Sequence, residues 1–102
     1  MDETDEVVLV AEATALPGKR GELLSAFNEL IPKALAESGV SAFRLHENRD
    51  QPGHFTLYER YHNQDCVETH FATDHFTAIS HALAELAEGG KPKITSYRIL
   101  TD

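Results

Sequence analysis

The spacing of apolar and polar residues changes repeatedly along this chain and predicts its first elements. Residues 7–16, VVLVAEATAL, are mostly β-branched or small apolar residues, which predicts a strand, and a Pro-Gly pair ends it. From Lys19, apolar residues recur every three or four positions, which predicts an amphipathic helix that Gly39 ends. Because a proline inside a helix removes a backbone hydrogen bond, we expect a kink or a short break at Pro32.

The rest of the chain predicts two more strands, a helical region and a last strand. VSAFRLHE (40–47) and HFTLYERYH (54–62) are expected to form a hairpin through the turn-rich residues 48–53. Residues 64–88 have helical spacing, and KITSYRIL (93–100) predicts the final strand. The order β-α-β-β-α-β is the ferredoxin-like α+β pattern, in which right-handed crossovers place the helices on one face of a four-stranded antiparallel sheet.

A capping signal divides the helical region in two. Thr73 is a suitable N-cap, and Asp74 follows in the first turn, where a carboxylate suits the helix dipole. We therefore expect a short helix over about 64–72 and a longer helix over about 74–88. The expected core stripe of the longer helix is Phe76, Ile79, Leu83 and Leu86.

The strands also predict an oligomer. Residues 7–11, VVLVA, are apolar at successive positions, so both faces of the first strand need cover, although the helices cover only one face. In the third strand Phe55, Leu57 and Tyr61 share one side, and Tyr58 takes the other. The sheet of a second subunit is the simplest cover for the open face, so we expect a two-fold homodimer with sheets packed face to face.

Composition and charge exclude several classes of function. The 102 residues suit a single domain, expected over 7–102 and preceded by a disordered acidic arm at 1–6. The net charge is -8, and without the four acidic residues of that arm 13 acidic residues remain against 9 basic ones. This balance disfavours nucleic acid and anionic membrane surfaces as partners, because both need a basic face.

The sequence also indicates where the chain resides. No apolar run approaches the roughly 18 residues of a membrane span, and the acidic N-terminus is unlike a signal peptide. The single cysteine, Cys66, leaves no intrachain disulfide and no multi-cysteine metal site. We therefore expect a cytoplasmic protein.

Three of the six histidines lie in HFATDHFTAISH (70–81). A helical metal pair needs histidines four residues apart, whereas His70 and His75 are five apart, about 140° around a helix. We therefore expect no metal site, and we do not expect the three histidines to form one site. His81 should face solvent, and His70, at the end of the short helix, can point between helix and sheet.

Three motifs together resemble the antibiotic biosynthesis monooxygenase (ABM) family, which includes small quinol monooxygenases. They are PGKRGELLSAF (17–27), LHENRDQPGHFTLYERY (45–61) and HFATDHF (70–76), and the resemblance covers about residues 7–100. It implies a dimeric α+β barrel with a pocket between helices and sheet in each subunit. Characterised relatives oxidise phenolic or hydroquinone-type polyketides with O2 and use no metal or flavin. Others degrade haem, and one isomerises a phosphorylated signalling sugar.

Two departures from the family pattern affect the expected chemistry. Haem-degrading relatives carry an asparagine on the first strand and a tryptophan with a ligand histidine later, whereas this chain has no tryptophan and no asparagine in 7–16. His70 stands where that tryptophan would be, and Ser80 or His81 falls near the ligand position. Haem degradation is therefore disfavoured. Tyr61 replaces a tryptophan that many relatives carry, which alters the expected pocket wall.

The resemblance implies oxidation of an ionised phenol by O2 without a cofactor. Triplet O2 reacts slowly with closed-shell molecules, but a hydroquinone anion can pass it one electron. The protein must supply a base, donors to the oxyanion and an apolar enclosure. His70 is the candidate base, Tyr58 and Arg44 are candidate donors, and His75 and His46 are reserve acid–base groups. The candidate aromatic walls are Phe71, Phe76 and Tyr61.

Glu59 has more than one interpretation, and so does the function of the chain. Glu59 can orient a histidine or bind the substrate, although an ion pair with Arg44 or Arg60 is the favoured use. The leading function is a monooxygenase acting on a hydroquinone or polycyclic phenol. The alternatives are an acid–base isomerase of a small metabolite and a non-catalytic ligand-binding or stress-response module. A sugar phosphate would need a basic pocket, and the arginines here, Arg98 included, are scattered.

Overall fold

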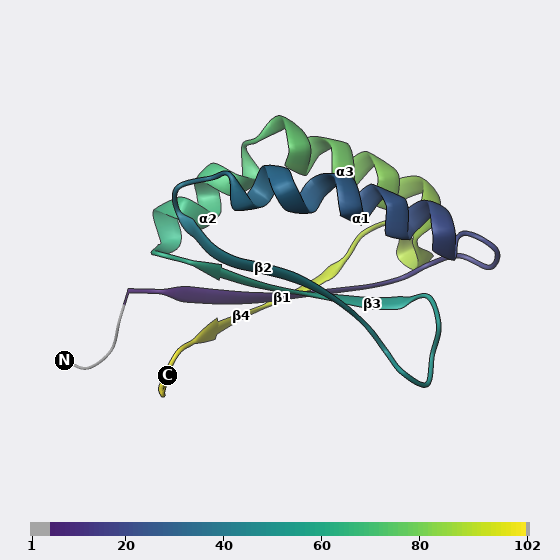
Figure 1. Ribbon diagram of the computed structural model, residues 1–102, viewed down its shortest axis with the longest axis horizontal. Coiled ribbons are helices and arrows are strands. Elements are labelled where there is room, and N and C mark those ends of the chain that lie inside the picture. The colour runs from purple at the N-terminus through teal and green to yellow at the C-terminus, as the bar shows by residue number, and fades with distance from the viewer. Residues whose placement is uncertain (1–4, 102) are drawn as a thin grey trace.

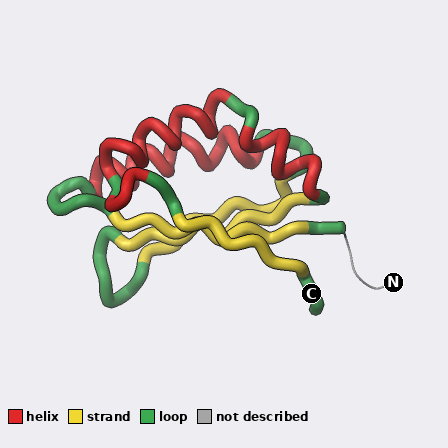
Figure 2. Tube along the Cα trace, turned by 180° about the vertical axis from the view of Figure 1, so that it is seen from behind, coloured by secondary structure: helices red, strands yellow, loops and turns green. Residues whose placement is uncertain are grey.

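The computed structural model describes residues 5–101 and has the predicted order of elements. The elements are β1 (Val7–Thr14), α1 (Arg20–Leu35), β2 (Val40–Glu47), β3 (His54–Tyr61), α2 (Gln64–Phe71), α3 (Asp74–Leu86), the 3-10 turn η1 (Glu88–Gly90) and β4 (Lys93–Arg98). The sheet has the order β2-β3-β1-β4, and every neighbouring pair is antiparallel. All helices lie on one face of it (Figures 1 and 2). The expected ferredoxin-like α+β fold is therefore confirmed.

The expected acidic arm falls partly outside this description. Residues 1–4 lie outside the described residues. Glu6 is placed, and its carboxylate accepts a hydrogen bond of 2.7 Å from the Arg60 guanidinium, so it belongs to the folded part. None of the helices described within residues 5–101 combines the length and the apolar character that a membrane crossing requires.

The alternation of side chains along the strands decides which residues face the helices. In β3, Phe55, Leu57 and Tyr61 are buried, as expected, and alternate with half-buried residues such as Tyr58. In β1, Ala11 stands opposite Leu57 and shares its face. Val8 is on the other face of β1 yet only 8% exposed, so one residue of the uncovered face is buried within a single chain. The homodimer remains a prediction.

The core lies between the sheet and a layer made by α1 and α3. The buried residues of α1 recur at helical spacing, and the Phe27 ring meets the Phe55 ring edge-on at 5.6 Å. We expected a kink or a short break at Pro32; the break is absent, because α1 is one continuous helix through its last turn. Both Pro32 and Asn28, whose carbonyl loses its helical partner, are exposed, so water can satisfy that carbonyl. The buried α1 residues are Leu23, Phe27, Leu30 and Ala34.

The predicted division of the second helical region is confirmed. α2 ends at Phe71 and α3 begins at Asp74. The Thr73 hydroxyl oxygen accepts a hydrogen bond from the backbone N–H of Phe76 at 3.1 Å and donates one to the carbonyl of His70 at 2.7 Å. This cap gives a free backbone N–H in the first turn of α3 an acceptor, and it links the start of α3 to the end of α2 by a hydrogen bond. Of the predicted core stripe, Ile79 and Leu83 are buried, and Phe76 and Leu86 are partly buried against the core.

Candidate functional site

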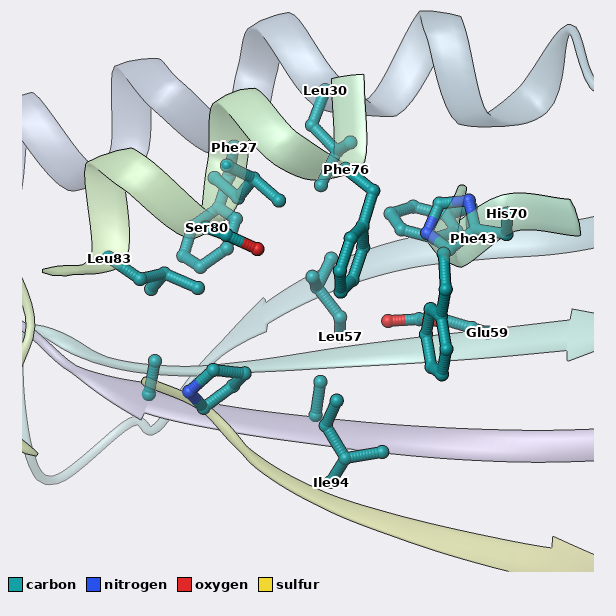
Figure 3. Close-up of a pocket in the computed structure, with 15 residues that line it drawn as sticks. Phe27, Leu30, Phe43, Leu57, Glu59, His70, Phe76, Ser80, Leu83 and Ile94 are labelled. Carbon is teal, nitrogen blue, oxygen red and sulfur yellow. The ribbon is translucent and has the colours of Figure 1, made fainter. Parts of the chain in front are cut away.

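An apolar pocket lies between the helix layer and the sheet (Figure 3). Its empty volume is about 470 Å³, part of which is open to solvent. Of the 15 residues that line it, only Glu59, His70 and Ser80 have polar side chains. His70 and Glu59 lie together at one end, and Ser80 lies toward the other (Figure 3). The pocket therefore has one end equipped for acid–base chemistry and walls suited to an aromatic ligand.

His70 is held by packing and by one hydrogen bond. It lies in the last turn of α2 and is only 2% exposed, with the rings of Phe43 and Phe76 centred 5.5 and 5.6 Å away. Its Nδ1 is 2.7 Å from Oε2 of Glu37. An ionised carboxylate only accepts hydrogen bonds, so Nδ1 is the donor to Glu37, and in the neutral ring Nε2 then keeps its lone pair. Since the His70 ring lines the pocket and Glu37 does not, Nε2 is the nitrogen left for a ligand.

Glu37 joins His70 to His75. It follows α1 in the turn before β2, and its Oε2 lies 2.6 Å from Nε2 of His75 as well as 2.7 Å from Nδ1 of His70. A close approach fixes this turn against α2: a Cβ on Gly39 would lie 2.6 Å from the Cβ of Cys66. Oε1 of Glu37 is buried and has no hydrogen-bond partner within residues 5–101. We call Glu37, His70 and His75 the carboxylate–histidine cluster.

The cluster brings together two of the three histidines of residues 70–81, so the three do not form one site, as expected, although His70 and His75 do share one. The rings of His70 and His75 are centred 5.7 Å apart. Spacing on one continuous helix would have separated them, but the chain changes direction between α2 and α3 and brings them to the same carboxylate. His81 is exposed, as expected, and lies outside the cluster.

One carboxylate and two imidazoles are also a donor set for Zn²⁺ or Fe²⁺. The three donor atoms lie within 4.8 Å of one another. Around a tetrahedral metal with bonds of about 2.1 Å, however, donor atoms lie about 3.4 Å apart. The observed N···O distances of 2.6 and 2.7 Å are shorter and fit shared protons, so Glu37 would have to withdraw to admit a metal ion.

Glu59 is the second ionisable group at this end of the pocket. It is 5% exposed, and its Oε1 accepts a hydrogen bond of 2.6 Å from the Tyr61 hydroxyl. Burial raises the pKa of Glu59 to about 7; the Tyr61 hydrogen bond opposes this shift, and the nearby charge of Glu37 adds to it. Burial also raises the pKa of Tyr61, and the charge of Glu59 adds to that shift. A carboxyl group that titrates near neutrality is matched to proton transfer.

The favoured use of Glu59, an ion pair with an arginine, is wrong. Glu59 is on the helix-facing side of β3 and is bonded to Tyr61, whereas Arg60 points away and binds Glu6. Arg44 is also on the far side of the sheet, since it stands opposite Tyr58 in the pairing of β2 with β3. The sheet therefore separates Glu59 from both arginines.

The same alternation removes three other expected residues from the pocket. Arg44 and Tyr58 line a shallow depression on the uncovered face of the sheet, and His46, opposite Thr56, points to that face too. Within one chain none of them meets His70, so the expected site that combined them is not formed. The reason is that successive strand residues point to opposite faces.

Two of the three expected aromatic residues line the pocket, and the third is buried behind its wall. Phe71 and Phe76 line the pocket, with ring centroids 4.8 Å apart. Tyr61 is fully buried beside His70, with ring centroids 5.6 Å apart, and does not line the pocket. It supports Glu59 and His70 and offers no surface to a ligand.

Sequence reasoning missed Glu37. No motif spacing connects it to the histidines, which lie more than thirty residues away in the sequence. One weak signal was present: a carboxylate just beyond a helix C-terminus is electrostatically unfavourable, so another interaction has to compensate it there.

The fold and the pocket define a ferredoxin-like α+β protein with an apolar chamber between helices and sheet. The sequence matches the family model for antibiotic biosynthesis monooxygenase (ABM) over residues 6–82, more than half of the chain. The chain therefore belongs to the ABM family, and the resemblance noted in the sequence is confirmed. Comparison with curated proteins gives no match.

Solved structures share the fold of this chain. The protein SO0527 from Shewanella oneidensis is 27% identical, with a TM-score of 0.85 over 97% of this chain and 95% of that chain. PA3566 from Pseudomonas aeruginosa is 26% identical, with a TM-score of 0.89 over 99% of this chain and all of that chain. A third structure, described as an antibiotic biosynthesis monooxygenase, is 22% identical with a TM-score of 0.79 over 91% and 95% of the two chains, and shares the fold.

Proposed function

We propose that this protein is a cofactor-independent monooxygenase that oxidises a small hydroquinone or related phenol with O2. The observation that supports it is the pair of ionisable side chains, His70 and Glu59, at one end of the pocket. The imidazole of His70, which binds Glu37 through Nδ1, and the carboxyl of Glu59, whose pKa is raised to about 7, lie together in an otherwise apolar enclosure. Membership of the ABM family supports the same reaction class.

The reaction needs no electrons from outside the substrate. His70 takes the proton of one phenolic hydroxyl, and the resulting anion passes one electron to O2, which gives a substrate radical and superoxide. These combine through a C–O bond to a hydroperoxide. Cleavage of the O–O bond leaves one oxygen on the ring as a new carbonyl or hydroxyl group, and the other leaves as water. One hydroquinone and one O2 thus give one hydroxyquinone and one water.

The pocket residues divide this work. His70 holds the transferred proton and returns it to the leaving oxygen. Glu59 in its protonated form donates a hydrogen bond to the second substrate oxygen, with Tyr61 fixing the carboxyl from behind. Phe71 and Phe76 pack against the aromatic ring of the substrate. Their apolar surface also keeps water from the peroxide.

The pocket disfavours the isomerase alternative. Among residues 5–101 no arginine or lysine lines it, so a phosphorylated sugar would meet the carboxyl of Glu59 without a compensating cation. A neutral hydroquinone meets no such penalty.

An oxygen electrode tests the proposal directly. Protein treated with EDTA and supplied with a series of mono- and bicyclic hydroquinones should consume one O2 per molecule oxidised, faster than uncatalysed autoxidation. Mass spectrometry with ¹⁸O2 should find one labelled oxygen in the product. Oxygen uptake no faster than autoxidation across the series would overturn the proposal.

A further inference from the structure

We infer that Glu37 is the positioning residue of the base: it orients His70, fixes the tautomer of its ring and balances the charge that the ring acquires. His75 in turn holds Glu37 from the solvent side. This inference rests on the proposed role of His70 as proton acceptor.

The first step concerns the orientation of the ring. A single hydrogen bond of 2.7 Å joins His70 Nδ1 to Glu37, and the rest of the ring is enclosed by aromatic side chains. Because the packing is apolar, it leaves rotation by 180° about the Cβ–Cγ bond without an electrostatic preference. The carboxylate supplies that preference, so Nε2 always faces the pocket.

The second step concerns charge. When Nε2 accepts a proton, an imidazolium forms at a site that is 2% exposed. A buried unpaired cation is costly, whereas one with a carboxylate at hydrogen-bond distance is compensated. His70 also lies in the last turn of α2, where the helix dipole favours a positive charge. Glu37 is the only carboxylate within residues 5–101 that is hydrogen-bonded to His70.

The third step concerns what keeps Glu37 in place. Its carboxylate is 13% exposed and belongs to a turn, not to a regular element. His75, in the first turn of α3, donates from Nε2 to the same oxygen at 2.6 Å and so anchors it from the opposite side. His75 also lines a groove between α1 and α3, with Glu29 and Lys33. It therefore closes the cluster where the cluster approaches the surface.

Within residues 5–101, charged and titratable groups face this cluster from two further elements, β3 and α1. Glu59 and Tyr61 approach from β3, and Glu29 and Lys33 border the groove on α1. Neither Glu29 nor Lys33 makes a hydrogen bond to Glu37 or to either histidine in the described part of the chain. Glu37, His70 and His75 are therefore hydrogen-bonded to one another and not to Glu29 or Lys33.

The test combines a measurement without substrate and one with it. Glu37→Gln keeps the shape of the side chain and removes its charge, so the amide can accept from one histidine or donate to it. In the wild-type protein, ¹⁵N NMR of the histidine rings should find His70 protonated at Nδ1 and unprotonated at Nε2. In Glu37→Gln the His70 signals should report a mixture of tautomers. A wild-type ring protonated at Nε2, or an unchanged ring in the variant, would overturn the inference.

The kinetic arm separates positioning from binding. Glu37→Gln should lower kcat about 100-fold and change KM less than about two-fold, because the substrate does not touch Glu37. Glu37→Asp, which keeps the charge, should recover part of the loss. Glu29→Gln, the same change on α1 in the bordering groove, is the matched control and should retain wild-type kcat. Equal losses in Glu37→Gln and Glu29→Gln would contradict the inference. Because the NMR arm needs no substrate, it decides the inference even if no hydroquinone is turned over.

Discussion

The two faces of the sheet carry similar side chains and differ in what those side chains can do. The covered face has Glu59 and Tyr61, enclosed with His70 by the helices. The uncovered face has Tyr58 and His46, which are accessible to water. Tyrosine and histidine are thus present on both sides. On the covered face burial alters the chemistry of a polar group, as the raised pKa of Glu59 illustrates.

The difference shows that residue type alone does not locate an active site in a sheet protein. Tyr58 and Glu59 are neighbours in the sequence, and the strand turns them to opposite sides. On the covered face an apolar surround removes water, and each polar group keeps one or two defined partners. On the uncovered face Arg44 and His46 are exposed, and the half-buried Arg60 binds Glu6.

The largest contrast is expected between two histidines on opposite sides. His70→Ala should lower kcat for hydroquinone oxidation about 1,000-fold, because it removes the base and leaves no other group in its place. His46→Ala should leave kcat within about two-fold of the wild type. Steady-state O2 uptake measures both, with circular dichroism to show that each variant is folded. Comparable losses in both variants would mean that the uncovered face takes part in the reaction.

The next contrast is between the carboxyl groups of Glu59 and Glu12, and it is expected in the pH dependence of the free energy of unfolding. The carboxyl of Glu59 has its ordinary value of 4.5 when unfolded and a pKa of about 7 when folded, so between these pH values the folded chain retains a proton that the unfolded chain has lost. Stability should therefore fall as the pH rises from about 4.5 to 7, by up to about 3 kcal/mol.

Urea denaturation at pH 5 and at pH 7.5 measures this fall. In Glu59→Gln the part due to this carboxyl should disappear. Glu12→Gln, which removes a more exposed carboxyl on the uncovered side of β1, should keep it. A wild-type protein whose stability is the same at both pH values would show that Glu59 is ionised throughout.

The smallest contrast is between two tyrosine hydroxyls. Tyr61→Phe removes the 2.6 Å hydrogen bond to Glu59 and should cost about 1–2 kcal/mol in the free energy of unfolding, because a buried acceptor loses its donor. Tyr58→Phe, on the uncovered face, should change it by less than about 0.5 kcal/mol. Thermal denaturation at pH 7.5 compares the two. A larger effect at Tyr58 would indicate that a partner covers its hydroxyl.

Much of the fold followed from local patterns. The strand over 40–47 was predicted with its observed bounds, and the division of the second helical region followed from the capping chemistry of Thr73 and Asp74. These features depend on neighbouring residues, which a sequence displays directly. The break expected at Pro32 failed because the cost of a proline depends on whether water can reach the freed carbonyl, which is a property of the surface.

The site was less accessible from the sequence. His70, Phe71 and Phe76 were predicted as pocket residues and line it. Glu37 was missed because its contact with the histidines depends on the packing of one turn against α2. Arg44 and Tyr58 were placed with His70 because their chemistry suited the reaction, although alternation along the strands already assigned Tyr58 to the side opposite Leu57. The alternation of side chains along a strand can be read from the sequence. Here it indicated which residues face the pocket better than residue type did.

The short connection between α2 and α3 has a consequence for homologous sequences. Ala72 and Thr73 alone separate the two helices, and they set the rotation of α3 relative to α2. One inserted residue would change the orientation of α3 relative to α2 and carry His75 away from Glu37, with every side chain of the cluster still present. Comparison of homologues should therefore count the length of this connection together with the two histidines. A relative that keeps the residues and changes the length has lost the arrangement.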